Sequence, residues 1–111
     1  MLITIVELPE FHKRAQKTFT NEEFDELLYF LSNNPKSGDL IQGSGGIRKL
    51  RWGAKGKGKS GGSRIIYFHY NKDIPLFLLT LFTKNEKINL SNSEKKVLAK
   101  MTKTLIENYK R

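Results

Sequence analysis

Hydrophobic residues along the chain recur with two different periods, which predict strands in some segments and helices in others. Residues 2–6 form a short apolar, β-branched run that is typical of a strand. Pro9 suits the first turn of a helix, which would continue through Phe11 and Ala15 to about Lys17. The chain is therefore predicted to open with one strand and one short helix.

A second helix is predicted from a capping signal that is followed by a helical stripe. Thr20 and Glu23 have the spacing of a capping box, in which each side chain accepts a backbone N–H at the helix start. The apolar positions that follow recur at i, i+3, i+4 and i+7: Phe24, Leu27, Leu28 and Leu31. The Asn-Asn-Pro sequence at 33–35 ends this helix.

Three further strands are predicted in the middle of the chain. Residues 47–52 alternate weakly, whereas residues 64–70 and 76–82 are rich in Ile, Tyr, Phe and Leu. Residues 71–75 make a plausible hairpin turn between the last two of these strands. All nine glycines fall between Gly38 and Gly62, so the backbone is expected to turn, or to approach a partner closely, in that region.

The last predicted element is a helix with its own capping box, formed by Ser91 and Glu94. We expect it to pack through one apolar stripe made of Val97, Leu98, Met101, Leu105 and Tyr109. The element order is β-α-α-β-β-β-α. Because consecutive strands with short loops pair antiparallel, we expect an α+β fold: a small antiparallel sheet with a mixed edge, and helices packed against one face.

The size and composition of the chain limit its architecture and its location. A chain of 111 residues is expected to form a single domain, residues 1–111. It contains no cysteine, and neither a signal peptide nor a membrane-length apolar run is recognisable. These features favour a cytoplasmic protein without a membrane partner.

Positive charge is concentrated in the middle third of the chain. Lysine and arginine number 20 against 11 acids, which gives a net charge of +9. No acid occurs between Asp39 and Asp73, where eight bases lie: Arg48, Lys49, Arg51, Lys55, Lys57, Lys59, Arg64 and Lys72. The other residues carry 12 bases and 11 acids, for a charge of +1. Such concentration is typical of a site for a polyanion.

A nucleotide-binding pattern inside this region is rejected on its context. Residues 53–60 match the P-loop pattern GxxxxGK[ST], and residues 56–61 match GxGxxG. Both patterns bind phosphate at the start of a helix, but here a predicted strand follows directly. ATP or GTP hydrolysis is therefore not expected, although the loop can still bind the phosphates of a nucleic acid.

A candidate reaction site follows from the predicted hairpin. If Tyr70 faces Leu76, then Arg64 lies opposite Phe82, and Lys84 points to the same side as Phe82. The lysine loop, with Lys55, Lys57 and Lys59, leads into that end of the sheet. Clustered cations would depress the lysine pKa values and suit a phosphate that gains charge in a transition state. A solvated basic loop that only binds nucleic acid remains an alternative.

Histidines and aromatic residues add little to this site. His12 lies on the short helix and His69 on a strand, so we expect structural or surface roles rather than a catalytic pair. Trp52, Tyr67 and Tyr70 can stack on bases, but strand aromatics belong more often to the core.

Several segments resemble a known family. They are NPKSGDLI at 34–41, GSGGIRKLR at 43–51, GGSRIIY at 61–67, LLTLFTKNEK at 78–87 and NLS at 89–91. Together they resemble the HigB branch of the RelE/ParE toxin superfamily, over the whole chain and in its element order. The resemblance implies a type II toxin: a ribosome-dependent endoribonuclease that cuts mRNA. It also implies a neighbouring gene for a neutralising antitoxin with a helix-turn-helix, through which alone operator DNA would be contacted.

The resemblance also implies residue roles, with neither metal nor cofactor. The implied catalytic residues are Lys55, Lys57, Arg64 and Lys84. The bases expected to bind RNA or the ribosome are Arg48, Lys49, Arg51, Lys59 and Lys87. Some relatives use a late tyrosine, but Leu90 stands near that position, so the general acid is open. Glu86 is expected to pair with a neighbouring lysine, with an acid–base role left open.

The expected reaction is attack of a ribose 2′-hydroxyl on the adjacent phosphate. Lys55 or Lys57 would help to take the proton, Arg64 would hold the non-bridging oxygens, and Lys84 would stabilise the phosphorane or the leaving oxygen. Two alternatives remain: a ParE-like gyrase inhibitor without catalysis, which the basic cluster around Arg64 disfavours, and a plain RNA-binding module.

Overall fold

The computed structural model describes residues 3–53, 62–87 and 89–109. Its elements are β1 (Ile5–Glu7), α1 (Pro9–Thr18), α2 (Asn21–Asn33), β2 (Asp39–Leu40), β3 (Ile47–Gly53), β4 (Gly62–Phe68), β5 (Leu76–Thr83) and α3 (Asn92–Tyr109). In this part of the chain, no helix has the length and apolar character needed to cross a membrane.

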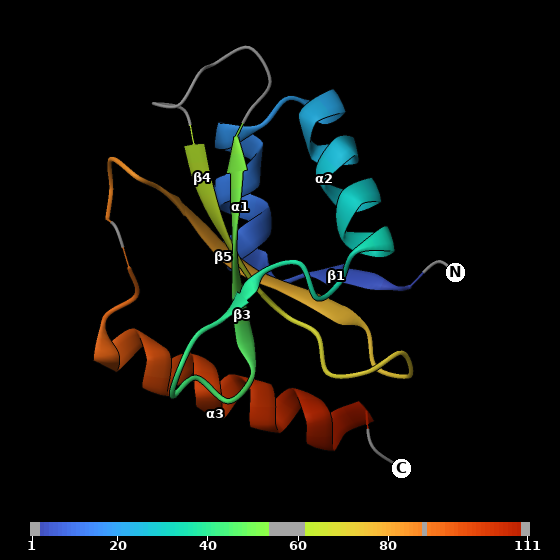
Figure 1. Ribbon diagram of the computed structural model, residues 1–111, viewed down its shortest axis with the longest axis vertical. Helices are drawn as coiled ribbons and strands as arrows, with labels where there is room; N and C mark the ends of the chain where they lie inside the picture. Colours follow the sequence, from blue (N-terminus) through green and yellow to red (C-terminus); the bar gives the residue numbers. More distant parts are fainter. Residues whose placement is uncertain (1–2, 54–61, 88, 110–111) are drawn as a thin grey trace.

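One mixed sheet forms the centre of the fold, with the strand order β1-β5-β4-β3-β2 (Figure 1). β1 pairs parallel with β5, and all the other neighbours pair antiparallel. The predicted α+β fold with a mixed edge is confirmed. The sequence did not indicate β2, because its two residues are both exposed and carry no apolar alternation.

Helices cover both faces of the sheet, so the expectation of a single covered face is wrong. Ile65 and Tyr67 of β4 belong to the core cluster with α1 and α2, whereas Ile66 and Phe68 belong to the cluster with α3. Neighbouring residues of a strand point to opposite faces, and in Figure 1 α3 lies apart from the α1–α2 pair. The physical reason is the unbroken apolar run 65–68, which is typical of a strand buried on both sides.

Local signals fixed the helix starts as predicted. Pro9 is the first residue of α1. Thr20 Oγ1 accepts the N–H of Glu23, and the Glu23 carboxylate accepts the N–H of Thr20. Ser91 and Glu94 form the same reciprocal pair immediately before α3. Both predicted capping boxes are therefore present.

The β4–β5 hairpin has the predicted register at one end only. Arg64 lies opposite Phe82, as predicted. Toward the turn, Tyr67 lies opposite Leu78. A hairpin in which Tyr70 faces Leu76 would instead place Tyr67 opposite Leu79. The pairing passes from Thr80 to Leu78 and leaves Leu79 as the extra residue of a β-bulge. The bulge offsets this one-residue difference, so the strands have the predicted register at the end that contains Arg64.

The predicted apolar stripe of α3 is only partly a packing face. Leu98 and Thr102 are its buried residues, and Leu105 is packed against the core. Val97 is 61% exposed and Met101 is 36% exposed. The sheet thus buries only part of the apolar side of α3. The apolar residues that stay exposed, Val97 and Met101, lie one helical turn apart on the same side of the helix.

Candidate functional site

Three strands place a row of side chains on the α3 face of the sheet. Arg51 of β3 is directly opposite Arg64 of β4, which is directly opposite Phe82 of β5. Phe82 belongs to the core cluster that contains Leu98 of α3, and directly opposed residues share a face. Arg51 and Arg64 therefore lie side by side on the face that α3 partly covers.

The two arginines lie in a part of the sheet that is poor in acids. No carboxylate forms an ion pair with either of them among the residues that the structure describes, and the sequence has no acid between Asp39 and Asp73. Like charges directly opposite each other on adjacent strands destabilise a sheet. An anion between the two guanidinium groups would relieve this repulsion.

Lys49 and Asn89 extend the site toward the loop before α3. Lys49 lies opposite Ile66, which places it on the same face as Arg51. Its Nζ donates a hydrogen bond to Asn89 Oδ1, at 2.8 Å. No local pattern in the sequence indicates that the loop at Asn89 reaches β3, so this contact could not be predicted. The contact orients the Lys49 ammonium beside the arginine row.

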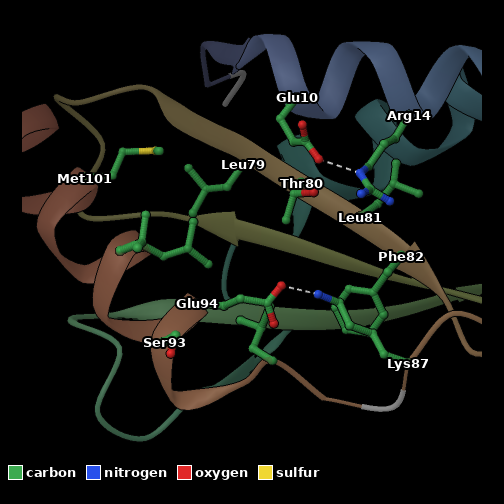
Figure 2. A pocket seen from close by; sticks show the side chains of 13 residues that line it. Glu10, Arg14, Leu79, Thr80, Leu81, Phe82, Lys87, Ser93, Glu94 and Met101 are labelled. Carbon is green, nitrogen blue, oxygen red and sulfur yellow. Dashed lines mark hydrogen bonds and ion pairs between the residues drawn. The ribbon is translucent and has the colours of Figure 1, made fainter.

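Lys87 lies over the aromatic ring of Phe82. Its Nζ is 5.1 Å from the centroid of the Phe82 ring and pairs with the Glu94 carboxylate, as Figure 2 shows. A cation above an aromatic face is attracted by the ring electrons. Phe82 thus connects Lys87 on one side with Arg64 on the neighbouring strand.

Lys84 and the lysine loop complete the predicted set. Lys84 follows β5, where its N–H donates to the carbonyl of Gly62, and its side chain is exposed. This pairing places it two positions beyond Phe82, at the end of the sheet where β4 begins. Lys55, Lys57 and Lys59 lie outside the described residues. The structure thus brings Lys49, Arg51, Arg64 and Lys87 to one face, with Lys84 at its end.

Two carboxylates near the site are held in their ionised form. Glu86 accepts the backbone N–H of Thr83 and pairs with Arg14, and both contacts lower the pKa of Glu86. The hydrogen bonds from Lys87 and from the Ser91 backbone lower the pKa of Glu94. The expected partner of Glu86, a neighbouring lysine, is wrong: the partner is Arg14, 72 residues away on α1. An ionised, paired Glu86 is a poor general acid.

Arg48 points away from this site. It lies opposite Tyr67, whose ring belongs to the cluster on the α1–α2 face. Its guanidinium donates to the carbonyls of Gly38, at 2.7 Å, and Lys36, at 3.1 Å. The structure therefore gives Arg48 a role in holding the 36–38 segment, on the other face from Arg51. Its predicted contact with RNA has no support from its placement.

The histidines and strand aromatics have structural surroundings. His12 Nδ1 is 3.1 Å from the Glu7 carboxylate, and burial together with Lys36 and Arg48 lowers the pKa of His69. Tyr67 is fully buried, and Trp52 packs against Phe30 with ring centroids 5.2 Å apart. Tyr70 is 48% exposed and stacks on Phe68.

Across residues 3–53, 62–87 and 89–109, no three His, Asp or Glu side chains gather as a metal site would require.

Comparison with known proteins assigns the chain to a family. The family model described as the RelE toxin of the RelE/RelB toxin–antitoxin system matches residues 5–111. The chain belongs to the RelE toxin family. As a RelE-family protein it is a toxin of a toxin–antitoxin system, and its partner is an antitoxin. The narrower HigB-type assignment stays a prediction.

A solved structure shows the same fold. The free state of a doubly substituted mutant of the E. coli toxin RelE superposes with a TM-score of 0.60, over 92% of this chain and 98% of that chain. The sequence identity is 14%, so the RelE fold is shared while most side chains differ. The likeness therefore shows the fold and not the roles of the site residues.

Proposed function

We propose that this toxin is a ribosome-dependent endoribonuclease that cuts mRNA and thereby stops translation. The observation that carries the proposal is the opposed pair of Arg51 and Arg64, on a face with two further cations. Neither arginine pairs with a carboxylate of the described residues. This arrangement is unfavourable for the isolated sheet, and a bound phosphate would make it favourable. The opposed arginines are therefore better explained by a function in binding phosphate than by a contribution to stability.

The chemistry we propose is an internal transfer at phosphorus. The ribose 2′-oxygen attacks the adjacent phosphate, the bond to the 5′-oxygen breaks, and a 2′,3′-cyclic phosphate and a 5′-hydroxyl result. Arg64 holds the two non-bridging oxygens with its planar fork, and Lys84 stabilises the leaving 5′-oxygen, which takes a proton from water. Lys55 or Lys57, outside the described residues, takes the 2′-hydroxyl proton as a neutral amine, the form that neighbouring cations favour. Arg64 and Lys84 supply the positive charge at the phosphate, so the scheme uses no metal.

The distribution of acids supports one orientation of the RNA. Four of the acids lie on α2, on the opposite side of the sheet from Arg64: Glu22, Glu23, Asp25 and Glu26. This acidic helix would repel a phosphate backbone. We therefore place mRNA and ribosomal RNA at the α3 face, along the row from Lys49 to Arg64.

Production of the toxin without its antitoxin is expected to stop protein synthesis before DNA synthesis. The reason is that cleavage of ribosome-bound mRNA removes the template for translation. Pulse labelling with amino acid and thymidine precursors measures both rates. If DNA synthesis stopped first while protein synthesis continued, the ParE-like alternative would be favoured and the proposal would be wrong.

Binding to ribosomes is expected to weaken steeply as the salt concentration rises, because phosphate contacts release counterions. Lys49→Ala and Arg51→Ala should each reduce the slope of log affinity against log salt by about one unit. Lys17→Ala, at the exposed end of α1, is the control and should leave the slope unchanged. A parental slope in both site variants would show that these two cations do not contact phosphate.

A helix-turn-helix antitoxin encoded by a neighbouring gene belongs to the same proposal, as does contact with operator DNA only through that antitoxin. The plain RNA-binding alternative predicts the same salt dependence but no cleavage. The two are therefore separated by the cleavage measurements in the Discussion.

A further inference from the structure

The hydrogen bond between Lys49 and Asn89 joins two segments that lie 40 residues apart in the sequence. Lys49 is on β3, two residues before Arg51 and on the same face of the sheet. Its Nζ donates to Asn89 Oδ1 at 2.8 Å. A lysine side chain has many rotamers, and this contact restricts Lys49 to those that reach the loop before α3. The ammonium is therefore oriented before any ligand binds.

The segment that carries Asn89 is itself held in place. The next residue, Leu90, is 7% exposed and belongs to the same core cluster as Leu98 of α3. Ser91 then caps α3 through its reciprocal hydrogen bonds with Glu94. A residue whose neighbours are packed and capped can orient another side chain. Asn89 thus offers Lys49 a fixed acceptor, although Asn89 is itself exposed.

The acceptor is neutral, and this distinguishes Lys49 from the nearby Lys87. Lys87 pairs with the Glu94 carboxylate, which compensates most of its charge (Figure 2). None of the ion pairs among the described residues includes Lys49. A side-chain amide oxygen accepts a hydrogen bond from an ammonium group but carries no net charge. Lys49 is therefore oriented without losing the charge that attracts an anion.

We propose that Asn89 is a positioning residue, which holds the Lys49 ammonium beside Arg51 for an RNA phosphate and leaves its positive charge uncompensated. The inference rests on the proposed function, because the phosphate is that of RNA in the ribosome complex. A phosphate that meets an already oriented cation binds with a smaller loss of side-chain entropy. Asn89 acts through Lys49 and needs no contact of its own with RNA.

Two substitutions of Asn89 have different expected effects on ribosome binding. Asn89→Ala removes the acceptor but leaves the charge of Lys49. The affinity should fall about two- to tenfold, the cost of ordering one long side chain, while the slope of log affinity against log salt stays parental. Asn89→Asp keeps an acceptor and adds a carboxylate. The slope should then fall by about one unit, as in Lys49→Ala, because one cation is compensated.

A merely structural role of Asn89 predicts a different result for Asn89→Asp. A carboxylate accepts an ammonium hydrogen bond at least as well as an amide does, so the loop would stay attached to β3 and binding would remain parental. Asn108→Asp is the matched control, because it adds the same charge at an exposed position near the other end of α3, and it should leave the slope unchanged. Fluorescence anisotropy of labelled toxin, titrated with ribosomes at several salt concentrations, measures the affinities. Circular dichroism confirms that the variants are folded.

A double substitution tests whether Asn89 acts through Lys49. In the Lys49→Ala background, Asn89→Ala should cause no further loss of affinity. A further loss there, a parental affinity of Asn89→Ala, or a parental slope of Asn89→Asp would overturn the proposal. Ribosome binding without salt dependence would overturn it together with the proposed function. A parental toxin that binds with a steep salt dependence but does not cut mRNA would contradict the proposed cleavage alone.

Discussion

Arg64→Lys is expected to bind ribosomes as the parent does and to cut mRNA about 100-fold more slowly or worse, as when one oxyanion donor is lost. Lysine keeps the charge but loses the planar fork that holds two phosphate oxygens. Arg64→Ala should be at least as slow. Single-turnover cleavage at saturating ribosome concentration separates the chemical step from binding.

The fold should tolerate both substitutions. Arg64 faces Arg51 directly, so its removal takes away a repulsion and should not lower the free energy of unfolding. Lys103→Ala, on the exposed side of α3, is the control and should cut at the parental rate. Undiminished cleavage by folded Arg64→Ala would remove Arg64 from the site and leave the chemistry to the lysine loop.

Tyr67→Phe is expected to lower the free energy of unfolding by about 1–3 kcal/mol, because it leaves buried polar groups without partners. The Tyr67 hydroxyl donates to the carbonyl of Pro35 and accepts the N–H of Gly38, each at 2.8 Å. Tyr67 is fully buried, and Gly38 is buried against its ring. Urea denaturation monitored by circular dichroism measures the change.

Because Tyr67 lies on the α1–α2 face, its loss should not alter cleavage while the protein stays folded. Tyr29→Phe, at an exposed tyrosine of α2, is the control and should change stability by less than about 0.5 kcal/mol. A Tyr67→Phe variant as stable as the parent would show that water replaces the hydroxyl. A folded variant with impaired cleavage would show that the two faces are coupled.

The features that could be predicted from the sequence have a local physical cause. The capping boxes at Thr20 and Ser91 need only a spacing of three residues, and both are present. The pairing of Arg64 with Phe82 is predicted by counting from a turn in which Tyr70 faces Leu76, and it is found because the bulge at Leu79 offsets a one-residue difference near the turn. The element order and the family could likewise be recognised from the sequence.

What could not be predicted from the sequence concerns contacts between distant segments. The charge pattern grouped Arg48 with Arg51, but residues three apart on a strand face opposite sides, and Arg48 binds the 36–38 segment instead. Neither the partner of Glu86 nor the contact between Lys49 and Asn89 has a local signal. The exposed Val97 could not be foreseen, because periodicity gives the apolar sector of α3 but not how much of it the sheet buries.

The most direct test of the proposed function is cleavage by the purified toxin of an mRNA held in a programmed ribosome, mapped by primer extension. The account predicts new 5′ ends within the ribosome-bound part of the message, and their loss with Arg64→Ala. The same mRNA without ribosomes should remain intact. An intact ribosome-bound mRNA with folded parental toxin, or equally fast cleavage without ribosomes, would contradict it.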